Sequence, residues 1–241
     1  MPQRIVKASS TEFTMRKEHQ KPTKVRPSVA DRFMLAVSFS RTVDGLWIGS
    51  YRTPEYLSRV ERALVLIRVH SPLHYSRILR DLKRIWVFLL PDGLAAYKHS
   101  LGACVLDERF LDDPETSIER IASTIVHEAT HATLERRGVG YPEDQRARIE
   151  AVCFRRELCF AVRLPDSLKL QQSIKEYLGW YPTHPEYFSD RHAIERATSG
   201  EVDMLRHVGT PDWLIRMMPL LKSIFGRARK LLEPASVDLD Q

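Results

Sequence analysis

One five-residue segment, His127-Glu128-Ala129-Thr130-His131, has the residue types and the spacing of a zinc site that activates water. On a helix, the two histidines fall on one face about one turn apart, so both imidazoles can reach one metal ion. Glu128 lies roughly 100° around the helix from His127 and can contact a water on that metal without being a ligand. The spacing therefore separates two metal ligands from one general base.

The neighbouring residues predict the helix that this arrangement requires. Apolar residues recur at helical spacing over residues 116–134, Asp112 and Asp113 are N-cap candidates, and Gly138 suits the C-terminus. The residues beside the histidines are uncharged. This favours a partly buried metal helix over the alternative, an ordinary helix with solvated histidines.

A catalytic zinc site normally has three protein ligands, so one more donor is required elsewhere. A turn at residues 138–142 leads into a second predicted helix over residues 143–162. A short loop would set the two helices antiparallel and bring Glu150, nineteen residues after His131, toward the histidines. Glu150 could instead pair with Arg146 on the surface. The other candidate donors are Glu135, Asp144, Glu157, His184 and His192.

An H-E-x-x-H helix with a glutamate about twenty residues downstream resembles the gluzincin zinc metallopeptidases. The resemblance extends over residues 101–162. It implies one zinc ion per chain, bound by His127, His131 and Glu150, with Glu128 as general base. It also implies hydrolysis of peptide bonds in a peptide or protein substrate by a zinc-activated water.

One related family is excluded, and one departure from the gluzincin pattern is visible. The metzincin pattern is excluded, because Leu134 and Arg137 occupy the positions of its glycine and third histidine. In gluzincins an aspartate often follows the glutamate ligand by four residues, but this chain has Phe154 there. A carboxylate that orients a ligand histidine must therefore come from elsewhere or be absent.

The remaining pattern predicts an α+β fold, mostly helical, with a small sheet before the metal helix. The resemblance to gluzincins implies that this fold is zincin-like. Strands are expected within residues 32–43 and at 46–49, 84–90, 94–99 and 101–107, with turns at Asp44-Gly45 and Pro91-Asp92-Gly93. Further helices are expected at residues 53–69 and 72–82. The C-terminal third is expected to be helical, at residues 165–178, in the region 181–192 and at 211–232.

The substrate cleft is predicted from the resemblance and from residue chemistry. In gluzincins, the strand before the metal helix is an edge along which an extended substrate pairs, a role that Gly102, Ala103 and Cys104 would take. The alternative is a strand that only packs on the helix. Hydrolysis also needs a donor for the developing oxyanion, and four residues are candidates. They are Tyr141, His184, Tyr187 and His192.

Composition limits the remaining classes of function. Residues 1–28 have a formal charge of +5 out of the chain's +6, which predicts a basic disordered tail before one domain over residues 29–241. The nearly neutral remainder argues against a nucleic-acid-binding face, although the tail keeps that alternative open. No apolar run reaches 18 residues, so no membrane span is expected.

The three cysteines, Cys104, Cys153 and Cys159, form no C-x-x-C pair and fit a reducing compartment, so a cytoplasmic location is expected. Cys153 and Cys159 read as small core residues of the second helix. The principal alternative to a peptidase is a noncatalytic zincin-like scaffold or partner-binding protein with a structural metal. A closed site with four protein ligands would mark that alternative.

Overall fold

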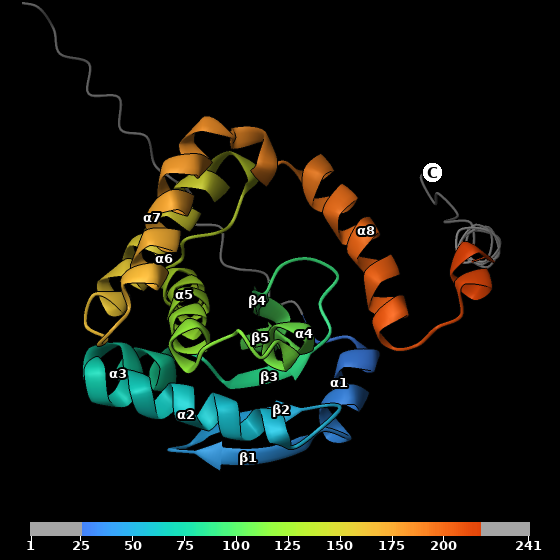
Figure 1. The fold of residues 1–241 in the computed structure, drawn as a ribbon, viewed down its shortest axis with the longest axis horizontal. Coiled ribbons are helices and arrows are strands. Elements are labelled where there is room, and N and C mark those ends of the chain that lie inside the picture. Colours follow the sequence, from blue (N-terminus) through green and yellow to red (C-terminus); the bar gives the residue numbers. More distant parts are fainter. Residues whose placement is uncertain (1–25, 218–241) are drawn as a thin grey trace, which may run out of the picture.

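The first half of the described chain contains a mixed sheet of five strands, in the order β1-β2-β3-β5-β4, together with helices before and between the strands (Figure 1). The structure is a computed structural model, and it describes residues 26–217. Strands β2, β3 and β5 are parallel, whereas β1 and β4 pair antiparallel at the two sides. The strands are β1 Phe39–Val43, β2 Leu46–Ser50, β3 Arg84–Phe88, β4 Ala95–Lys98 and β5 Ala103–Asp107.

Helices make up most of the chain after the sheet, so the predicted α+β class is confirmed (Figure 1). The longer helices are α1 Val29–Ala36, α2 Glu55–His70, α3 Pro72–Asp81, α4 Glu108–Asp112, α5 Ile118–Arg136, α6 Arg146–Ala161, α7 Leu168–Trp180 and α8 Asp190–His207. Short 3-10 turns are η1 His99–Leu101, η2 Glu143–Gln145, η3 Tyr181–Thr183 and η4 Pro185–Phe188. Among the described residues, no helix is both long and apolar enough to cross a membrane.

The first predicted strand, residues 32–43, is only half correct. Its second part forms β1, but its first part belongs to α1. Ser28 caps this helix by accepting from the backbone N–H of Asp31, whose carboxylate accepts from the backbone N–H of Ser28. This reciprocal capping box starts a helix that the apolar pattern alone did not distinguish from a strand. The Asp44-Gly45 turn is confirmed, with positive φ at both residues.

The sheet has a core on each face, because successive strand residues point to opposite sides. Ile85 and Val87 of β3 join the main core with α2, α3 and α5, whereas Trp86 faces the smaller core against α1. Helix α5 packs against α2, α3, α6 and the sheet. The predicted metal helix is thus the central helix of the structure.

The ends of α5 are set by local sequence. Ser117 is the N-cap and accepts from the backbone N–H of Arg120, so the predicted caps Asp112 and Asp113 are wrong. Asp112 instead ends α4. Gly138 follows the helix at φ +79°, as predicted, and donates its N–H to the carbonyl of Glu135.

The predicted substrate edge at Gly102, Ala103 and Cys104 is also wrong. Strand β5 is paired on both sides, by β3 and by β4, and Ala103 and Cys104 are fully buried. Gly102 precedes the strand and ends η1 in the left-handed region. Because the chain folds back before β5, strand β4 is the outer strand on this side of the sheet.

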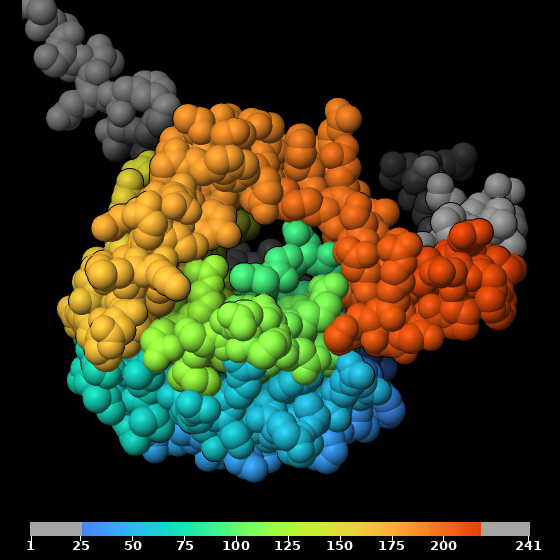
Figure 2. Space-filling model, viewed as in Figure 1, coloured from blue at the N-terminus to red at the C-terminus, as the bar shows by residue number. Residues whose placement is uncertain are grey.

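Helix α8 forms an arch with α7 on the side of the molecule away from α2 (Figure 1). Figure 2 shows the surface hollowed between this arch, in orange, and the segments drawn in green. None of the residues of α8 is buried. Ion pairs attach the helix to the rest of the protein, among them Arg196 with Asp92 at 2.9 Å, Asp190 with Arg146 at 2.6 Å and His207 with Glu108 at 3.0 Å.

Gly200 lets α8 approach the Pro91 turn closely, and this contact can be tested. A Cβ atom at Gly200 would lie 1.5 Å from the Pro91 carbonyl oxygen, so we expect Gly200→Ala to displace α8. Amide hydrogen exchange in α8 should then be faster than in the wild type. Gly179→Ala in α7 is the control, since its Cβ would meet nothing within 4 Å and should stabilise the protein by about 1 kcal/mol. Unchanged exchange in Gly200→Ala would contradict this account.

Candidate metal centre

The short connection between α5 and α6 sets the two helices side by side and brings Glu150 to both histidines (Figure 1). Its two carboxylate oxygens lie 3.1 Å from His127 Nε2 and 3.3 Å from His131 Nε2. The Glu150 carboxylate therefore contacts the Nε2 atom of each imidazole. The structure thus brings together the three residues that the sequence predicts as metal ligands.

This group is enclosed by protein. His127 and Glu128 are each only 7% exposed, which rules out the alternative of solvated helix-face residues. The surface pairing of Glu150 with Arg146 is wrong as well. Arg146 instead pairs with Asp190 at 2.6 Å and donates to the Phe188 carbonyl. The Glu150 carboxylate points toward the two histidines instead.

Glu157, one of the alternative donors from the sequence, orients His127 from the opposite side. Its Oε2 lies 3.0 Å from His127 Nδ1, and its Oε1 accepts from the Ser123 hydroxyl at 2.7 Å. The Arg120 guanidinium lies 3.7 Å from the same oxygen. A carboxylate on the second ring nitrogen fixes a ligand histidine with its Nε2 free for a metal. Glu157 supplies the orienting carboxylate that is absent at Phe154.

Opposing effects set the charge states of this group. Burial alone would lower the pKa of His127, but the carboxylates of Glu150 and Glu157 raise it to about 10. Burial would raise the pKa of Glu150, but hydrogen bonds with His127 and His131 hold it well below the usual range. The two carboxylates therefore favour the protonated form of the His127 imidazole that lies between them.

Glu128, the predicted general base, has a different environment. Burial raises its pKa, and the repulsion from Glu150 and Glu157 acts in the same direction, against the attraction of His127 and His131. A carboxylate with a raised pKa takes up and gives back a proton more readily near neutral pH. Glu128 is thus suited to proton transfer.

Tyr141 is the predicted oxyanion donor that lies closest to the histidines and Glu150. Its hydroxyl donates to Glu150, and its ring stands edge-on to His131 with the centroids 5.5 Å apart. Burial, followed by the Glu150 charge, raises the pKa of this hydroxyl, so it remains a donor. Tyr141 holds the Glu150 carboxylate in place.

The other candidates have different contacts. His184 stacks on Trp180, and His192 contacts the hydroxyl of Ser189, the N-cap of α8. Tyr187 lies under the Arg196 guanidinium, 4.0 Å from its ring centroid. Within residues 26–217, none of these three side chains forms a hydrogen bond or ion pair with His127 or His131, and neither do two of the alternative ligands. The two ligands are Glu135, which pairs with His99, and Asp144, which lies in η2.

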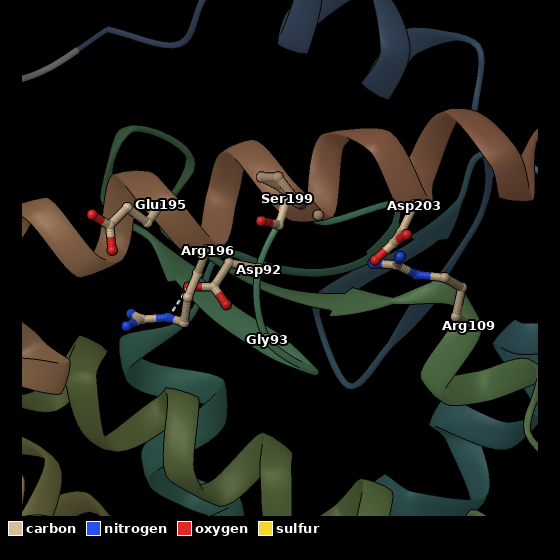
Figure 3. Close-up of a pocket in the computed structure, with 9 residues that line it drawn as sticks. Asp92, Gly93, Arg109, Glu195, Arg196, Ser199 and Asp203 are labelled. Atoms are coloured by element: carbon tan, nitrogen blue, oxygen red, sulfur yellow. Dashed lines mark hydrogen bonds and ion pairs between the residues drawn. The ribbon is translucent and has the colours of Figure 1, made fainter. Parts of the chain in front are cut away.

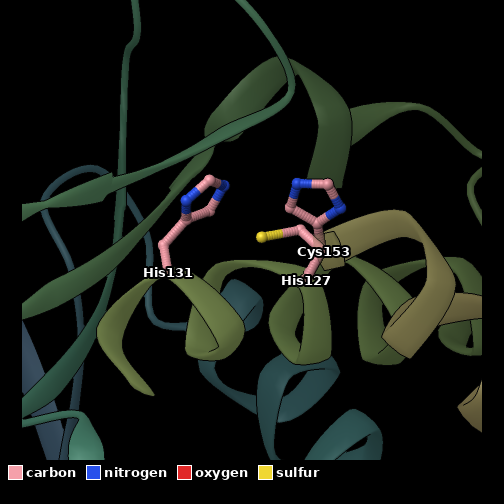
Figure 4. Close-up of side chains that lie close together, drawn as sticks. All are labelled: His127, His131 and Cys153. Atoms are coloured by element: carbon pink, nitrogen blue, oxygen red, sulfur yellow. The ribbon is translucent and has the colours of Figure 1, made fainter. Parts of the chain in front are cut away.

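Cys153 is a donor whose place the sequence analysis did not predict. Its Sγ and one ring nitrogen from each of His127 and His131 lie within 4.8 Å of one another. Figure 4 shows the thiol directed into the space between the two imidazoles. Cys153 is fully buried, and it follows Glu150 by three residues on α6.

The donors and their charges fit a divalent metal. Glu128, Glu150 and Glu157 are three buried or nearly buried carboxylates, and Arg120 compensates one of them. With both imidazoles neutral, the formal charge of these groups is −2, opposite to that of a zinc ion. Imidazole, carboxylate and thiolate are all ligands that zinc takes. The histidines, Glu150 and Cys153 are therefore the residues that could hold it.

The two residues whose roles the sequence analysis missed follow a helical pattern. Cys153 and Glu157 lie three and seven residues after Glu150, so all three share one face of α6. Ser123, which holds Glu157, lies four residues before His127 on the equivalent face of α5. The helical spacing of these polar residues on α5 and α6 is the sequence signal for the roles of Cys153 and Glu157.

A pocket of about 420 Å³ lies beneath α8, away from the residues of this centre (Figure 3). It is lined by the Pro91-Asp92-Gly93 turn, by Arg109 and by one face of α8. The ion pair between Arg196 and Asp92 crosses it, and none of the candidate metal donors lines it. The pocket therefore belongs to the attachment of α8.

Glu157 should matter for metal affinity although it is not a proposed ligand. Glu157→Gln keeps the size of the side chain but weakens its hold on His127 Nδ1, so zinc affinity should fall about 10- to 100-fold. Competition with a chelator measures this change. Glu176→Gln on α7, at an exposed residue paired with Gln172, is the matched control and should bind zinc as the wild type does. Equal affinities in both variants would exclude the orienting role.

Without metal, His127 should make stability depend on pH. Its pKa is higher in the folded protein than the ordinary value of 6.5, so the protonated ring stabilises the fold fully below pH 6.5. This contribution is lost as the pH rises through about 10. In chelator-treated protein, we expect the Tm to fall over this range in the wild type and to fall less in His127→Gln. Parallel Tm curves for the two proteins would refute this linkage.

The chain shows no significant match to protein-family models, to curated proteins or to solved structures. The resemblance to gluzincins therefore depends on the His127–His131 segment and its spacing to Glu150. To these the structure adds the contacts among the three side chains and the orienting carboxylate of Glu157.

Proposed function

We propose that this protein is a zinc-dependent metallopeptidase of the gluzincin type, with a zincin-like arrangement of its sheet and metal helices. One observation carries the proposal: the Glu150 carboxylate reaches Nε2 of both His127 and His131, at 3.1 and 3.3 Å. Zinc bonds to nitrogen and oxygen ligands are about 2.0 to 2.2 Å long, so donors at these separations can share one ion.

The residues around these donors support a catalytic role. A bound zinc ion would supply a Lewis acid that polarises a peptide carbonyl and acidifies a water. Glu128 would take the proton of the attacking water and deliver it to the leaving amine, so no covalent enzyme intermediate forms. Burial and the nearby carboxylates raise the pKa of Glu128, which favours this proton transfer.

Strand β4 is the sheet edge that an extended peptide would use. It is the outer strand beside β5, and it packs on α5, the helix that carries the histidines. Glu135 near the end of α5 pairs with His99, directly after β4. A peptide that adds to this edge by main-chain hydrogen bonds would lie alongside the metal helix. The hollow under the α7 and α8 arch leaves space on this side (Figure 2).

A noncatalytic protein with a structural metal is the second candidate, and Cys153 favours it. With His127, His131 and Glu150, this thiol makes four protein donors, as many as a closed structural zinc site has. Such a site would bind zinc and stabilise the α5–α6 pair without hydrolysing a substrate. A nucleic-acid-binding function would use the basic tail predicted at residues 1–28, of which residues 1–25 lie outside the described part of the chain.

Glu128→Gln separates the two candidates. The amide keeps the shape of the side chain but cannot accept the proton, so hydrolysis of a peptide library should fall at least about 100-fold. The zinc content, measured by mass spectrometry, should remain near one ion per chain. Zinc binding without hydrolysis in the wild type would leave the structural-metal candidate, and full hydrolysis in Glu128→Gln would exclude the assigned base.

Two comparison variants test the ligand assignment in the same experiment. His131→Ala and Glu150→Ala should both lose zinc, because each removes one of the three proposed ligands. Full zinc retention in Glu150→Ala would move the third ligand to another residue. A wild type that takes up no zinc on titration would overturn the metallopeptidase proposal as a whole.

A further inference from the structure

We infer that Cys153 is a fourth protein donor to the same metal, so that the centre has a closed state in which its sulfur occupies the position otherwise open to water. The inference rests on the proposed metal site and concerns how that site is regulated. A substrate oxygen or water can reach the metal only when this sulfur leaves or the coordination expands.

The position of Cys153 on α6 supports this role. Glu150, Cys153 and Glu157 share the face of α6 that packs on α5. The two glutamates on this face contact His127 from its two ring nitrogens. Cys153 lies between them in sequence, and its sulfur is within 4.8 Å of a nitrogen of each histidine. All three side chains therefore lie near the ring of His127.

The chemistry of sulfur makes this position significant. Thiolate is a soft ligand that zinc binds readily alongside imidazole. On ligation, the S–H bond breaks, a bond between sulfur and the metal forms, and the proton is released to solvent. The oxidation states of sulfur and metal do not change. No oxidant or reductant is therefore required.

The other two cysteines show that burial or helix position alone does not create this arrangement. Cys104 is fully buried in β5 and belongs to the main hydrophobic core. Cys159 lies on α6 like Cys153, but it is exposed. Within the described residues, neither belongs to a group of donors close enough to hold a metal. Cys153 alone of the three has that geometry.

Cobalt(II) is the probe that tests the inference, because a sulfur ligand gives it an intense charge-transfer absorption in the near ultraviolet, which nitrogen and oxygen ligands lack. We expect the full-length wild type loaded with cobalt to show this band. Cys153→Ser should still bind cobalt but lose the band, whereas Cys159→Ser should keep it. Zinc affinity, measured by chelator competition, should fall at least about tenfold in Cys153→Ser and stay unchanged in Cys159→Ser.

The wild-type spectrum alone can decide the question, even where a variant folds poorly. Cobalt uptake that depends on His131 but gives no sulfur band would overturn the role of Cys153 and leave the proposed function intact. A band that persists in Cys153→Ser would also overturn it. Failure of the wild type to bind cobalt or zinc would overturn the metal site itself, together with this inference.

Discussion

The structure depends most on the contact between buried imidazole and carboxylate groups at the junction of α5 and α6. Charged groups are costly to bury unless each has a partner, and here His127 lies between Glu150 and Glu157 at 3.1 and 3.0 Å. The packing of the helices around this junction must therefore keep His127 in contact with both carboxylates. An apolar pair of helices could shift at small cost, but this pair cannot, because a shift would leave a buried charge unpaired.

The fold provides a rigid support for this junction. Helix α5 is enclosed by α2, α3, α6 and the sheet, and its ends are fixed by Ser117 and Gly138. The side chains that face α6 from α5 therefore have little freedom. Tyr141, in the connection between the two helices, donates its hydroxyl hydrogen to Glu150 and packs its ring edge-on to His131. Side chains supported in this way are preorganised for the proposed metal.

The same junction accounts for both functional candidates. Three donors with one free position describe a catalytic zinc, and the addition of Cys153 describes a closed one. The difference between an enzyme and a metal-stabilised scaffold thus comes down to whether one sulfur can leave the metal.

Helical spacing over a short stretch of chain was enough to predict that His127 and His131 share a helix face beside Glu128. The short loop made the approach of Glu150 the favoured choice among several candidate donors. The three-dimensional packing was needed to select Glu150, to make β4 rather than β5 the outer strand, and to turn Glu157 and Cys153 toward the histidines. Strand order and the rotation of one helix against another depend on contacts between distant residues, which the spacing along one chain segment does not specify.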